Sequence, residues 1–452
     1  MLRRQFCRYA STFRSTTALK RPVFDIRAIL ARSDEMRTSM ERRGERDTSR
    51  LDFILENRQK EIDLQNERNR LVNERKSLGS RMAGLVKQGN LEEKADLQNK
   101  LLDFKTRISA VEADLDALSE KIHNAVESLP NWLDCSVPQD PLEPEVVQVI
   151  GGTSLMEIES SMPVNQNDHK KIGEALGLME FVAASRISGS SWYYLVGDGA
   201  LLEQALVQYA LRRARQKGYR MVVPPSIVKS EVVNACGFKP KDQNNEKQVY
   251  EIEGEDLSLT GTAEIPLGAL HSSSTIDLPR KYVGVSRSYR AEAGARGKDT
   301  TGLYRVHEFT KVELFHFTDS SRSEKDLEEL RLFQTSIIED LGLRAKMLNM
   351  PTTDLGAPAM KKYDCEAWMP GRGSWGELTS CSNCGDYQAR RLGIRHKNSA
   401  GKLDYVHTLN GTAMAVPRVI VAIIEQNYDP QTKSVKIPSP LVPYMDGKTH
   451  IT

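Results

Sequence analysis

The sequence has no long hydrophobic segment and few cysteines. None of its 452 residues lie in an apolar run near the roughly 20 residues that a membrane-spanning helix needs, so we expect no membrane partner. The six cysteines are too few and too scattered for a disulfide framework, which favours a reducing compartment. With 27% charged and 39% hydrophobic residues, the composition is typical of a globular protein, and a net charge of +2 indicates no particular partner.

Several common catalytic and binding signatures are also missing. There is no G-x-S-x-G nucleophile elbow, no Walker A sequence and no HExxH metal motif. PGRGSWGE contains a G-x-G-x-x-G spacing, but no helix-opening pattern follows it, so we do not expect a dinucleotide site. Cys381 and Cys384 have zinc-like spacing without a second pair, so we expect two buried structural cysteines and no structural zinc.

The first 21 residues differ in composition from the rest of the chain. They contain six basic residues, and no acidic residue occurs before Asp25. Their apolar residues are dispersed between the arginines instead of forming the apolar block of a secretory signal. This pattern predicts a mitochondrial targeting peptide over residues 1–21, and hence the mitochondrial matrix; the alternative is a disordered basic tail.

Residues 48–129 show the periodicity of a helical hairpin. From Leu97 to Leu129 the apolar positions alternate in steps of four and three, the a/d pattern of a coiled coil. A second, heptad-spaced leucine stripe lies upstream, and Gly89 and Asn90 between the two runs suit a turn. The pattern predicts two antiparallel helices of about 55 Å, within a domain spanning residues 22–130.

One edge of this predicted hairpin is basic. Such a stripe is often only a solvated helix face, but it also suits the backbone of a nucleic acid. The basic residues that we regard as candidates for nucleic-acid binding are Arg68, Arg70, Arg75, Lys76 and Arg81.

A proline-rich segment separates the hairpin from the remainder. We interpret residues 131–168 as a linker or entry strand and residues 169–452 as one α+β domain. In that domain an amphipathic helix is expected over 199–219, ending near Gly218, followed by a strand that Pro224 closes.

Three separated stretches of that domain are rich in arginine and glutamate. They are 286–315, which ends in the expected strand RVHEFTKVELF (305–315), then WGELTSCSN (375–383), and a turn feeding a helix at 409–428. On the odd-numbered face of the expected strand, Arg305 and Glu313 lie on either side of Phe309, while Val306, Val312 and Leu314 face inward. Arginines with carboxylates, and no nucleophile or base, suggest phosphate-anhydride chemistry driven by positioning and charge; structural salt bridges are the alternative.

These stretches resemble the seryl-tRNA synthetases, which are class II aminoacyl-tRNA synthetases, of the bacterial and organellar type. KGYRMVVPP resembles motif 1, YRAEAG…GLYRVHEFTKVELF motif 2, and LNGTAMAVPRVIVAIIE motif 3. TGTAEIPL, ELTSCSNCGDYQARR and the hairpin are similar to features particular to the seryl enzymes. The resemblance covers about residues 24–430.

The resemblance implies an antiparallel-sheet catalytic domain of the α+β class, a homodimer formed through motif 1, and a two-step reaction. L-Serine and ATP would give seryl-adenylate, and serine would then pass to the 3′ end of tRNA(Ser). A class II synthetase for another amino acid is one rival. Another is a catalytically inactive relative acting as an RNA-binding or regulatory protein, which would be expected to have lost Arg290, Glu313, Glu377 or Arg418; all four are present.

Site residues follow from the resemblance, position by position. Arg290, Arg305, Glu313 and Arg418 would be catalytic. The implied ATP site is Arg290, Glu292, Arg305, Val306, Phe309, Glu377, Leu378, Thr379, Ser380 and Arg418, with Mg²⁺ on Glu377 and Ser380. The implied serine site is Thr262, Ala263, Glu264, Arg290, Glu313, Asn410 and Thr412.

Two positions depart from the family pattern. Glu308 stands where glutamine is more common, and by strand parity it faces away from Glu313. Pro417 precedes the motif 3 arginine in place of glycine, which a first helical turn tolerates because its N–H has no helical partner there. We expect neither change to prevent substrate binding.

Overall fold

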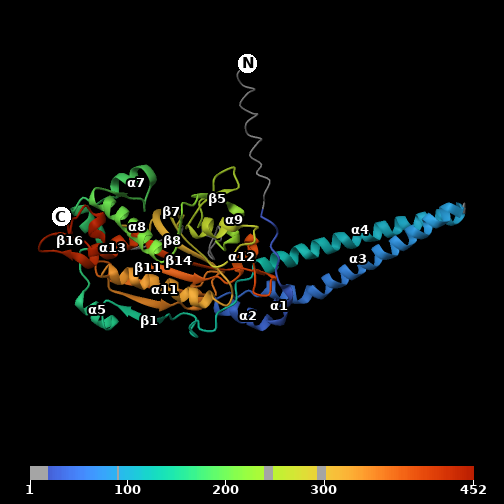
Figure 1. Ribbon diagram of the computed structural model, residues 1–452, viewed down its shortest axis with the longest axis horizontal. Helices are drawn as coiled ribbons and strands as arrows, with labels where there is room; N and C mark the ends of the chain where they lie inside the picture. The colour runs from blue at the N-terminus through green and yellow to red at the C-terminus, as the bar shows by residue number, and fades with distance from the viewer. Residues whose placement is uncertain (1–18, 89–90, 239–247, 293–301) are drawn as a thin grey trace, which may run out of the picture. The chain divides into compact units, whose positions relative to one another are not determined.

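The computed structural model describes residues 19–88, 91–238, 248–292 and 302–452. It divides into two compact units, Phe24–Trp132 and the remainder of the chain (Figure 1). Most of the predicted targeting peptide, residues 1–21, therefore lies outside the described residues. Among the helices described, none is both long enough and apolar enough to cross a membrane.

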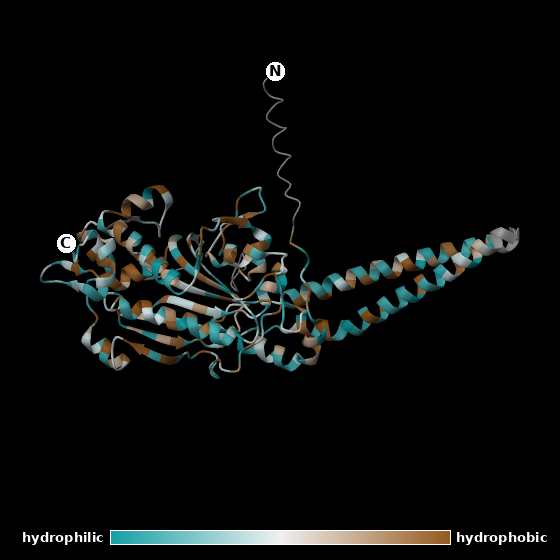
Figure 2. Ribbon diagram, in the orientation of Figure 1, coloured by the Kyte–Doolittle hydropathy of each residue, from teal (hydrophilic) through white to brown (hydrophobic). Residues whose placement is uncertain are grey.

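The unit Phe24–Trp132 contains the predicted helical hairpin. Its helices are α1 (Ile26–Ala31), α2 (Ser33–Arg42), α3 (Ser49–Gln88) and α4 (Leu91–Glu127), and α3 and α4 together form what we call the hairpin. Apolar residues recur along both long helices (Figure 2). Leu97, Ile108, Leu115 and Ile122 are buried at the predicted spacing, which confirms the coiled-coil pattern. The predicted turn residues Gly89 and Asn90 lie outside the described part of the chain.

A large sheet organises the second unit. Within the described residues it has eight strands, and all neighbouring pairs are antiparallel except β4 with β7. The antiparallel α+β architecture is thus confirmed. In spatial order the strands are β1 (Glu145–Ile150), β9 (Ala345–Asn349), β10 (Lys361–Met369), β11 (Ser374–Asn383), β14 (His407–Ala415), β8 (Glu308–Thr318), β7 (Arg280–Tyr289) and β4 (Arg220–Val222).

Three helices bury one face of this sheet (Figure 1). They are α8 (Asp198–Gln216), α11 (Ser323–Asp340) and α13 (Val416–Asn427). Val312 and Leu314 of β8 are fully buried in the cluster that these helices form with the sheet. The even-numbered residues of this strand therefore face the main core, as its alternation predicts.

Shorter elements complete the unit. The helices are α5 (Leu155–Ser161), α6 (His169–Ala175), α7 (Val182–Ser188), α9 (Ser230–Ala235), α10 (Glu264–Gly268) and α12 (Tyr387–Leu392). The strands are β2 (Met179–Glu180), β3 (Tyr194–Leu195), β5 (Ile227–Lys229), β6 (Leu257–Leu259), β12 (Arg395–Lys397), β13 (Leu403–Tyr405), β15 (Tyr428–Asp429), β16 (Ser434–Lys436) and β17 (His450–Ile451). Elements α10 and α12 pack on β8 and β14.

Three local predictions need correction or refinement. The strand predicted from Arg305 begins only at Glu308, so Arg305 lies in the preceding turn and does not share a strand with Phe309 and Glu313. The predicted turn before the motif 3 helix is instead strand β14, which runs directly into α13. The segment 131–168 contributes the edge strand β1 to the sheet, which fits an entry strand better than a free linker.

A buried hydrogen-bond cluster joins distant segments beside the sheet. Glu425 of α13 accepts bonds from the backbone and the ring Nδ1 of His169 (3.1 and 2.9 Å) and from the backbone N–H groups of Gly371 and Arg372 (2.9 and 3.1 Å). The other ring nitrogen of His169 accepts the N–H of Leu303 at 3.1 Å, which requires the proton on Nδ1. One carboxylate thus ties α6, the β10–β11 turn and the segment before β8 together.

Candidate functional site

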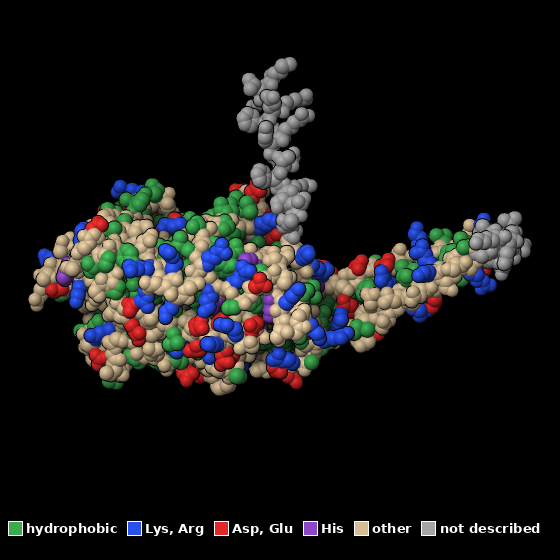
Figure 3. Space-filling view, in the orientation of Figure 1, with side chains coloured by type: hydrophobic (Ala, Val, Ile, Leu, Met, Phe, Trp, Pro, Cys, Tyr) green, Lys and Arg blue, Asp and Glu red, His purple; other side chains and the backbone are tan. Residues whose placement is uncertain are grey.

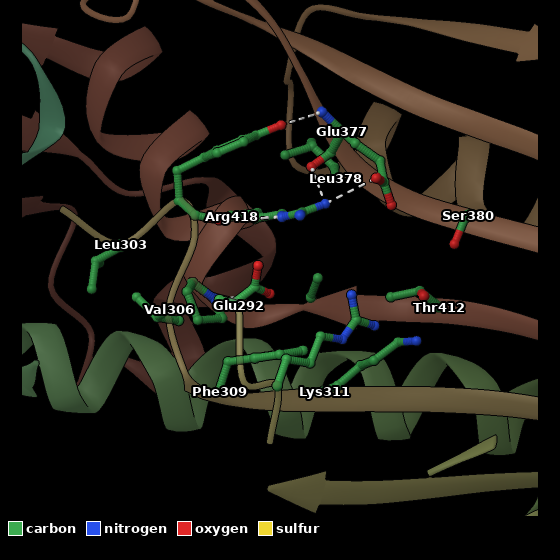
Figure 4. A pocket seen from close by; sticks show the side chains of 14 residues that line it. Glu292, Leu303, Val306, Phe309, Lys311, Glu377, Leu378, Ser380, Thr412 and Arg418 are labelled. Atoms are coloured by element: carbon green, nitrogen blue, oxygen red, sulfur yellow. Dashed lines mark hydrogen bonds and ion pairs between the residues drawn. The ribbon is translucent and has the colours of Figure 1, made fainter. Parts of the chain in front are cut away.

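A cavity lies on the face of the sheet opposite the main core and is open to solvent, with about 520 Å³ of space between its walls (Figure 4). Strands β8, β11 and β14 and the start of α13 contribute to it. The predicted site residues that line it are Arg290, Glu292, Val306, Phe309, Glu377, Leu378, Ser380, Thr412 and Arg418. The other lining residues are Leu303, Tyr304, Lys311, Ala415 and Pro417.

Two strand irregularities decide which side chains face this cavity. In β11 the register shifts so that Leu378 has no direct partner on β10, and Leu378 and Thr379 are both buried. As a result Glu377 and Ser380, three residues apart, both line the cavity. A regular strand would turn residues three apart to opposite faces.

A similar register shift occurs in β14. Ala413 has no partner in the pairing with β8, and Ala413 and Met414 are both buried in the main core. Thr412 and Ala415 therefore both line the cavity despite their odd separation. Because β14 ends there, α13 begins at the cavity wall and brings Arg418 into it.

Two arginines give one end of the cavity its positive charge. Arg290, which follows β7, lies over the Phe309 ring with its guanidinium carbon 5.3 Å from the ring centre. Burial lowers the pKa of Arg290, and the neighbouring Arg418 lowers it further. Two arginines that repel each other in a partly buried site would be stabilised by an anion placed between them.

Glu377 provides the counter-charge to Arg418. Its Oε2 lies 3.1 Å from Arg418 Nη1, and its backbone N–H donates to the Tyr304 hydroxyl at 2.9 Å (Figure 4). Burial alone would raise the pKa of Glu377, but Arg418, Lys362 and Arg290 together hold it at about 2. The carboxylate is consequently ionised at all physiological pH values.

Glu377 and Ser380 also satisfy the chemistry of a hard-cation site. Both side chains are oxygen donors on the same face of β11, and the carboxylate is permanently charged. Mg²⁺ is bound through one or two carboxylates together with substrate phosphates, so these residues fit the ion that the family resemblance implies.

Acidic and hydroxyl groups cluster beside Lys311, next to the arginines. Lys311 Nζ lies 2.5 Å from Glu313 Oε2 and 3.1 Å from Thr262 Oγ1, and the Thr262 hydroxyl donates to Glu313 at 3.2 Å. Thr412 is directly opposite Glu313 in the β8–β14 pairing. Glu313, Thr262 and Thr412 are almost completely buried.

A second carboxylate, Glu264, lies at the start of α10. Its Oε1 accepts from the side-chain amides of Gln388 (2.8 Å) and Asn410 (2.9 Å). Burial raises the pKa of Glu264 to about 7, with a further contribution from Glu313, while Lys311 acts in the opposite direction. The structure thus brings Thr262, Glu264, Glu313 and Asn410 together in one buried polar group.

Seven residues of the predicted ATP and serine sites are not among those that line the cavity: the four of the buried polar group and, in addition, Arg305, Thr379 and Ala263. Arg305 forms an ion pair with Glu292, which adopts a left-handed backbone conformation (φ +45°). Thr379 is buried on the core side of the β11 irregularity, and Ala263 is buried in the cluster beneath α10.

Tyr304, Lys311 and Gln388 are not among the predicted site residues. Lys311 has the same strand parity as Phe309 and Glu313, which is a signal that was available. Tyr304 and Gln388 had no such signal, because their importance depends on contacts with Glu377 and Glu264, far away in the sequence.

The basic hairpin residues differ in their pairing. Arg68 binds Glu112 of the partner helix at 3.1 Å, and Arg70 binds Glu74 of its own helix at 2.9 Å. Arg75, Lys76 and Arg81 are exposed. Figure 3 shows Lys and Arg side chains on the hairpin surface.

The cavity can therefore hold a molecule with anionic groups, and two of its lining residues, Lys311 and Thr412, adjoin the buried carboxylate of Glu313. Arg290 and Arg418 favour phosphate or carboxylate groups, Phe309 offers a flat apolar surface, and the buried carboxylates favour an ammonium group.

Comparison with known proteins agrees with this chemistry. Residues 248–427 match the family model of the tRNA synthetase class II core domain (G, H, P, S and T), and residues 23–133 match that of the seryl-tRNA synthetase N-terminal domain. Mitochondrial serine–tRNA ligase of Saccharomyces cerevisiae is 44% identical over 96% of this chain and 97% of its own length. Serine–tRNA ligase of Treponema denticola is 40% identical over 85% of this chain and 92% of its own.

A solved structure matches as well. Seryl-tRNA synthetase from Pyrococcus horikoshii, complexed with ATP, superimposes with a TM-score of 0.86 at 33% identity, covering 95% of this chain and 99% of that one. The chain therefore belongs to the seryl-tRNA synthetase family of class II aminoacyl-tRNA synthetases and has the family's serine–tRNA ligase activity.

Proposed function

We propose that this chain activates L-serine with ATP to seryl-adenylate and transfers the seryl group to the 3′ end of tRNA(Ser) in the mitochondrial matrix. The observation that carries the proposal is that Arg290 and Arg418 line a cavity whose residue Lys311 contacts the buried carboxylate of Glu313. The phosphates of ATP match the arginines in charge, and the ammonium group of serine matches the carboxylate. The alternative of an inactive relative has no support in the site, since its arginines and carboxylates are in place.

In the formation of seryl-adenylate, each of these residues would have a separate role. Arg290 would neutralise charge at the α-phosphate and the serine carboxylate, while Arg305 and Arg418 would hold the outer phosphates. Phe309 would stack on the adenine, with Glu292, Val306, Leu378 and Thr379 around the nucleotide. Since the serine carboxylate is already ionised at pH 7, attack on the α-phosphorus needs positioning and no general base.

A Mg²⁺ ion would be held by Glu377 and Ser380 together with the phosphates of ATP. When bound, it supplies charge compensation on those phosphates. Arg418, already paired with Glu377 at 3.1 Å, would be fixed in reach of the same phosphates.

Selection of serine would rest on hydrogen bonds. We assign its ammonium and hydroxyl groups to the buried polar group of Thr262, Glu264, Glu313 and Asn410, together with Thr412 and Ala263. Alanine would leave buried polar groups unpaired and should be rejected strongly. Threonine adds only a methyl group, so its exclusion rests on fit, about 1–3 kcal/mol.

Amino-acid-dependent ATP–pyrophosphate exchange tests the proposed reaction. We expect purified protein lacking residues 1–21 to exchange with serine and not with alanine, and only weakly with threonine. Exchange with a different amino acid would reassign the substrate, and exchange with none would favour an inactive relative.

The pH dependence of serine binding gives a further prediction. Because the pKa of Glu264 is raised to about 7, this group loses its charge as the pH falls below 7, so the KM for serine should rise by up to about tenfold per pH unit there. The groups facing it are Glu313, Lys311 and Arg290. Exchange kinetics between pH 6 and 8 would measure this, and Glu264→Gln should flatten the profile. A KM for ATP that followed the same profile would contradict the assignment to Glu264.

The hairpin would bind the tRNA backbone through its basic residues. Changing the exposed Arg75 and Lys76 to alanine should weaken tRNA charging and make its salt dependence shallower, while serine activation is unchanged. The matched control changes Lys100 and Arg107 of α4, which pair with acidic residues of their own helix. Equal losses in both variants, or loss of activation, would count against this role. Arg68 and Arg70 are less suitable for the test, because Arg68 links the two helices.

A homodimer is also part of the proposal. Val223, next to the edge strand β4, is 86% exposed, and Val182, Ile187, Met221 and Ile227 are also exposed. Hydrophobic side chains gather over α7 on the surface (Figure 3). Exposed apolar surface of this kind is typical of a subunit interface, and Met221 and Val223 lie in the segment resembling motif 1.

The mitochondrial assignment rests on the composition of residues 1–21 and on the likeness to mitochondrial ligases of Saccharomyces cerevisiae and Schizosaccharomyces pombe, at 44% and 43% identity. Import of a fluorescent fusion carrying residues 1–21 would test it.

A further inference from the structure

Lys311 occupies an unusual place in the site. It lies in the middle of β8, is only 8% exposed, and lines the cavity beside Thr412 (Figure 4). Its ammonium group is 2.5 Å from Glu313 Oε2 and 3.1 Å from Thr262 Oγ1. A buried lysine requires a counter-charge, and Glu313, itself 1% exposed, supplies it.

The partners of Lys311 are the groups proposed to bind the serine ammonium. Glu313 and Thr262 also bond to each other at 3.2 Å, so these three groups form a closed triangle. A second alkylammonium ion cannot approach the same oxygens without repelling Lys311, because like charges a few ångströms apart in a buried site are strongly unfavourable. Serine and Lys311 therefore compete for Glu313.

We propose that Lys311 is an internal occupant of the ammonium subsite, which the α-ammonium of serine displaces. In the free protein it keeps Glu313 and the nearby Glu264 from forming an uncompensated pair of buried acids. This inference rests on the proposed function, since it assumes that serine binds at Glu313.

The displaced ammonium has a nearby destination. Lys311 lines the same cavity as Arg290, where the serine carboxylate and the α-phosphate would meet. A lysine side chain with four rotatable bonds can move its charge there without moving the backbone. Displacement by serine would thus deliver a third cation to the reacting groups only when an amino acid with an α-ammonium is present.

Ethanolamine has the ammonium and hydroxyl groups of serine but no carboxylate. It can therefore displace Lys311 from Glu313 without taking part in the reaction, which separates the displacement from the delivery of charge to the reacting groups. In Lys311→Met, its inhibition constant against serine should fall by about tenfold, since no internal cation has to leave. The kcat of serine-dependent exchange should fall by about 100-fold, because the delivered cation is missing. Both are measured at pH 8, where Glu264 is ionised, and Lys311→Arg should restore the wild-type inhibition constant at least in part.

A control variant and the contrary outcomes make the test decisive. Lys281→Met removes a lysine of the neighbouring strand β7, whose ammonium pairs with Glu329, and should change neither value. An unchanged or increased ethanolamine inhibition constant in Lys311→Met would overturn the proposal, as it would mean that Lys311 only supports the fold or contacts phosphate.

A measurement on the unaltered protein covers the case in which Lys311→Met does not fold. In a crystal structure with a non-hydrolysable seryl-adenylate analogue, the Lys311 ammonium should have left Glu313 and contact the acyl or phosphate-like oxygens. Retention of the Lys311–Glu313 contact beside the bound analogue would overturn the proposal. Failure of the proposed function is distinguishable, because unaltered protein would then show no serine-dependent exchange.

Discussion

Replacing Arg290 by alanine should reduce serine-dependent ATP–pyrophosphate exchange by about 1,000-fold in kcat/KM, the scale of removing a preorganised charge from a transition state. Arg290 lines the cavity, and the Phe309 ring holds its guanidinium group in place with a centre-to-carbon distance of 5.3 Å. Burial and Arg418 lower its pKa more than the nearby carboxylates of Glu292, Glu377 and Glu313 raise it, so a bound anion would stabilise its charge further.

A lysine at this position distinguishes charge from geometry. Arg290→Lys retains a positive charge but loses the planar fork that binds two oxygens at once, and should recover only a small part of the activity. Arg280→Gln at the start of the preceding strand β7, where the arginine side chain donates to the Asp277 carbonyl, serves as the control and should leave exchange unchanged. Full activity in Arg290→Lys would show that charge alone suffices, and full activity in Arg290→Ala would remove Arg290 from the mechanism.

Replacing Glu425 by alanine should lower the free energy of unfolding by roughly 3–5 kcal/mol. The change removes the acceptor of four hydrogen bonds and leaves the backbone N–H groups of His169, Gly371 and Arg372 without their partner in a buried region. Because His169 also holds the backbone of Leu303 in the cavity wall, the KM for ATP should rise as well. Thermal unfolding and exchange kinetics measure the two effects.

A control of the same chemical type is available in α11. Glu339→Ala removes an exposed carboxylate from the end of that helix and should change stability by less than about 0.5 kcal/mol. If Glu425→Ala were as stable as Glu339→Ala, the cluster around His169 would not be a structural tie.

Periodic segments were predictable from the sequence because a single local rule governs them. The alternation in β8 correctly places Val312 and Leu314 in the core, and the three-four spacing along α4 correctly predicts the buried residues of the hairpin. The error at Arg305 occurred where the rule ends. The prediction applied the alternation of a strand to Arg305, which lies three residues before the start of β8 at Glu308, in a turn where side chains do not alternate.

The carboxylate pKa values show the limit of sequence reasoning in the site. Glu264 and Glu377 are the same residue type, yet burial beside Glu313 raises the pKa of the first to about 7, whereas three cations hold that of the second at about 2. The cations near Glu377 come from β10, α13 and the end of β7. No spacing along the chain indicates such a meeting of segments.

The sequence by itself determined the class of elements, the hairpin and the motifs of the family, since each depends on residues close together in the chain. Only the tertiary structure decided which side chains share the cavity. The irregularities at Leu378 and Ala413 turn Glu377 with Ser380, and Thr412 with Ala415, to one face of the sheet. An extra residue in a strand is accommodated by its pairing with neighbouring strands, and that pairing exists only once distant segments have come together.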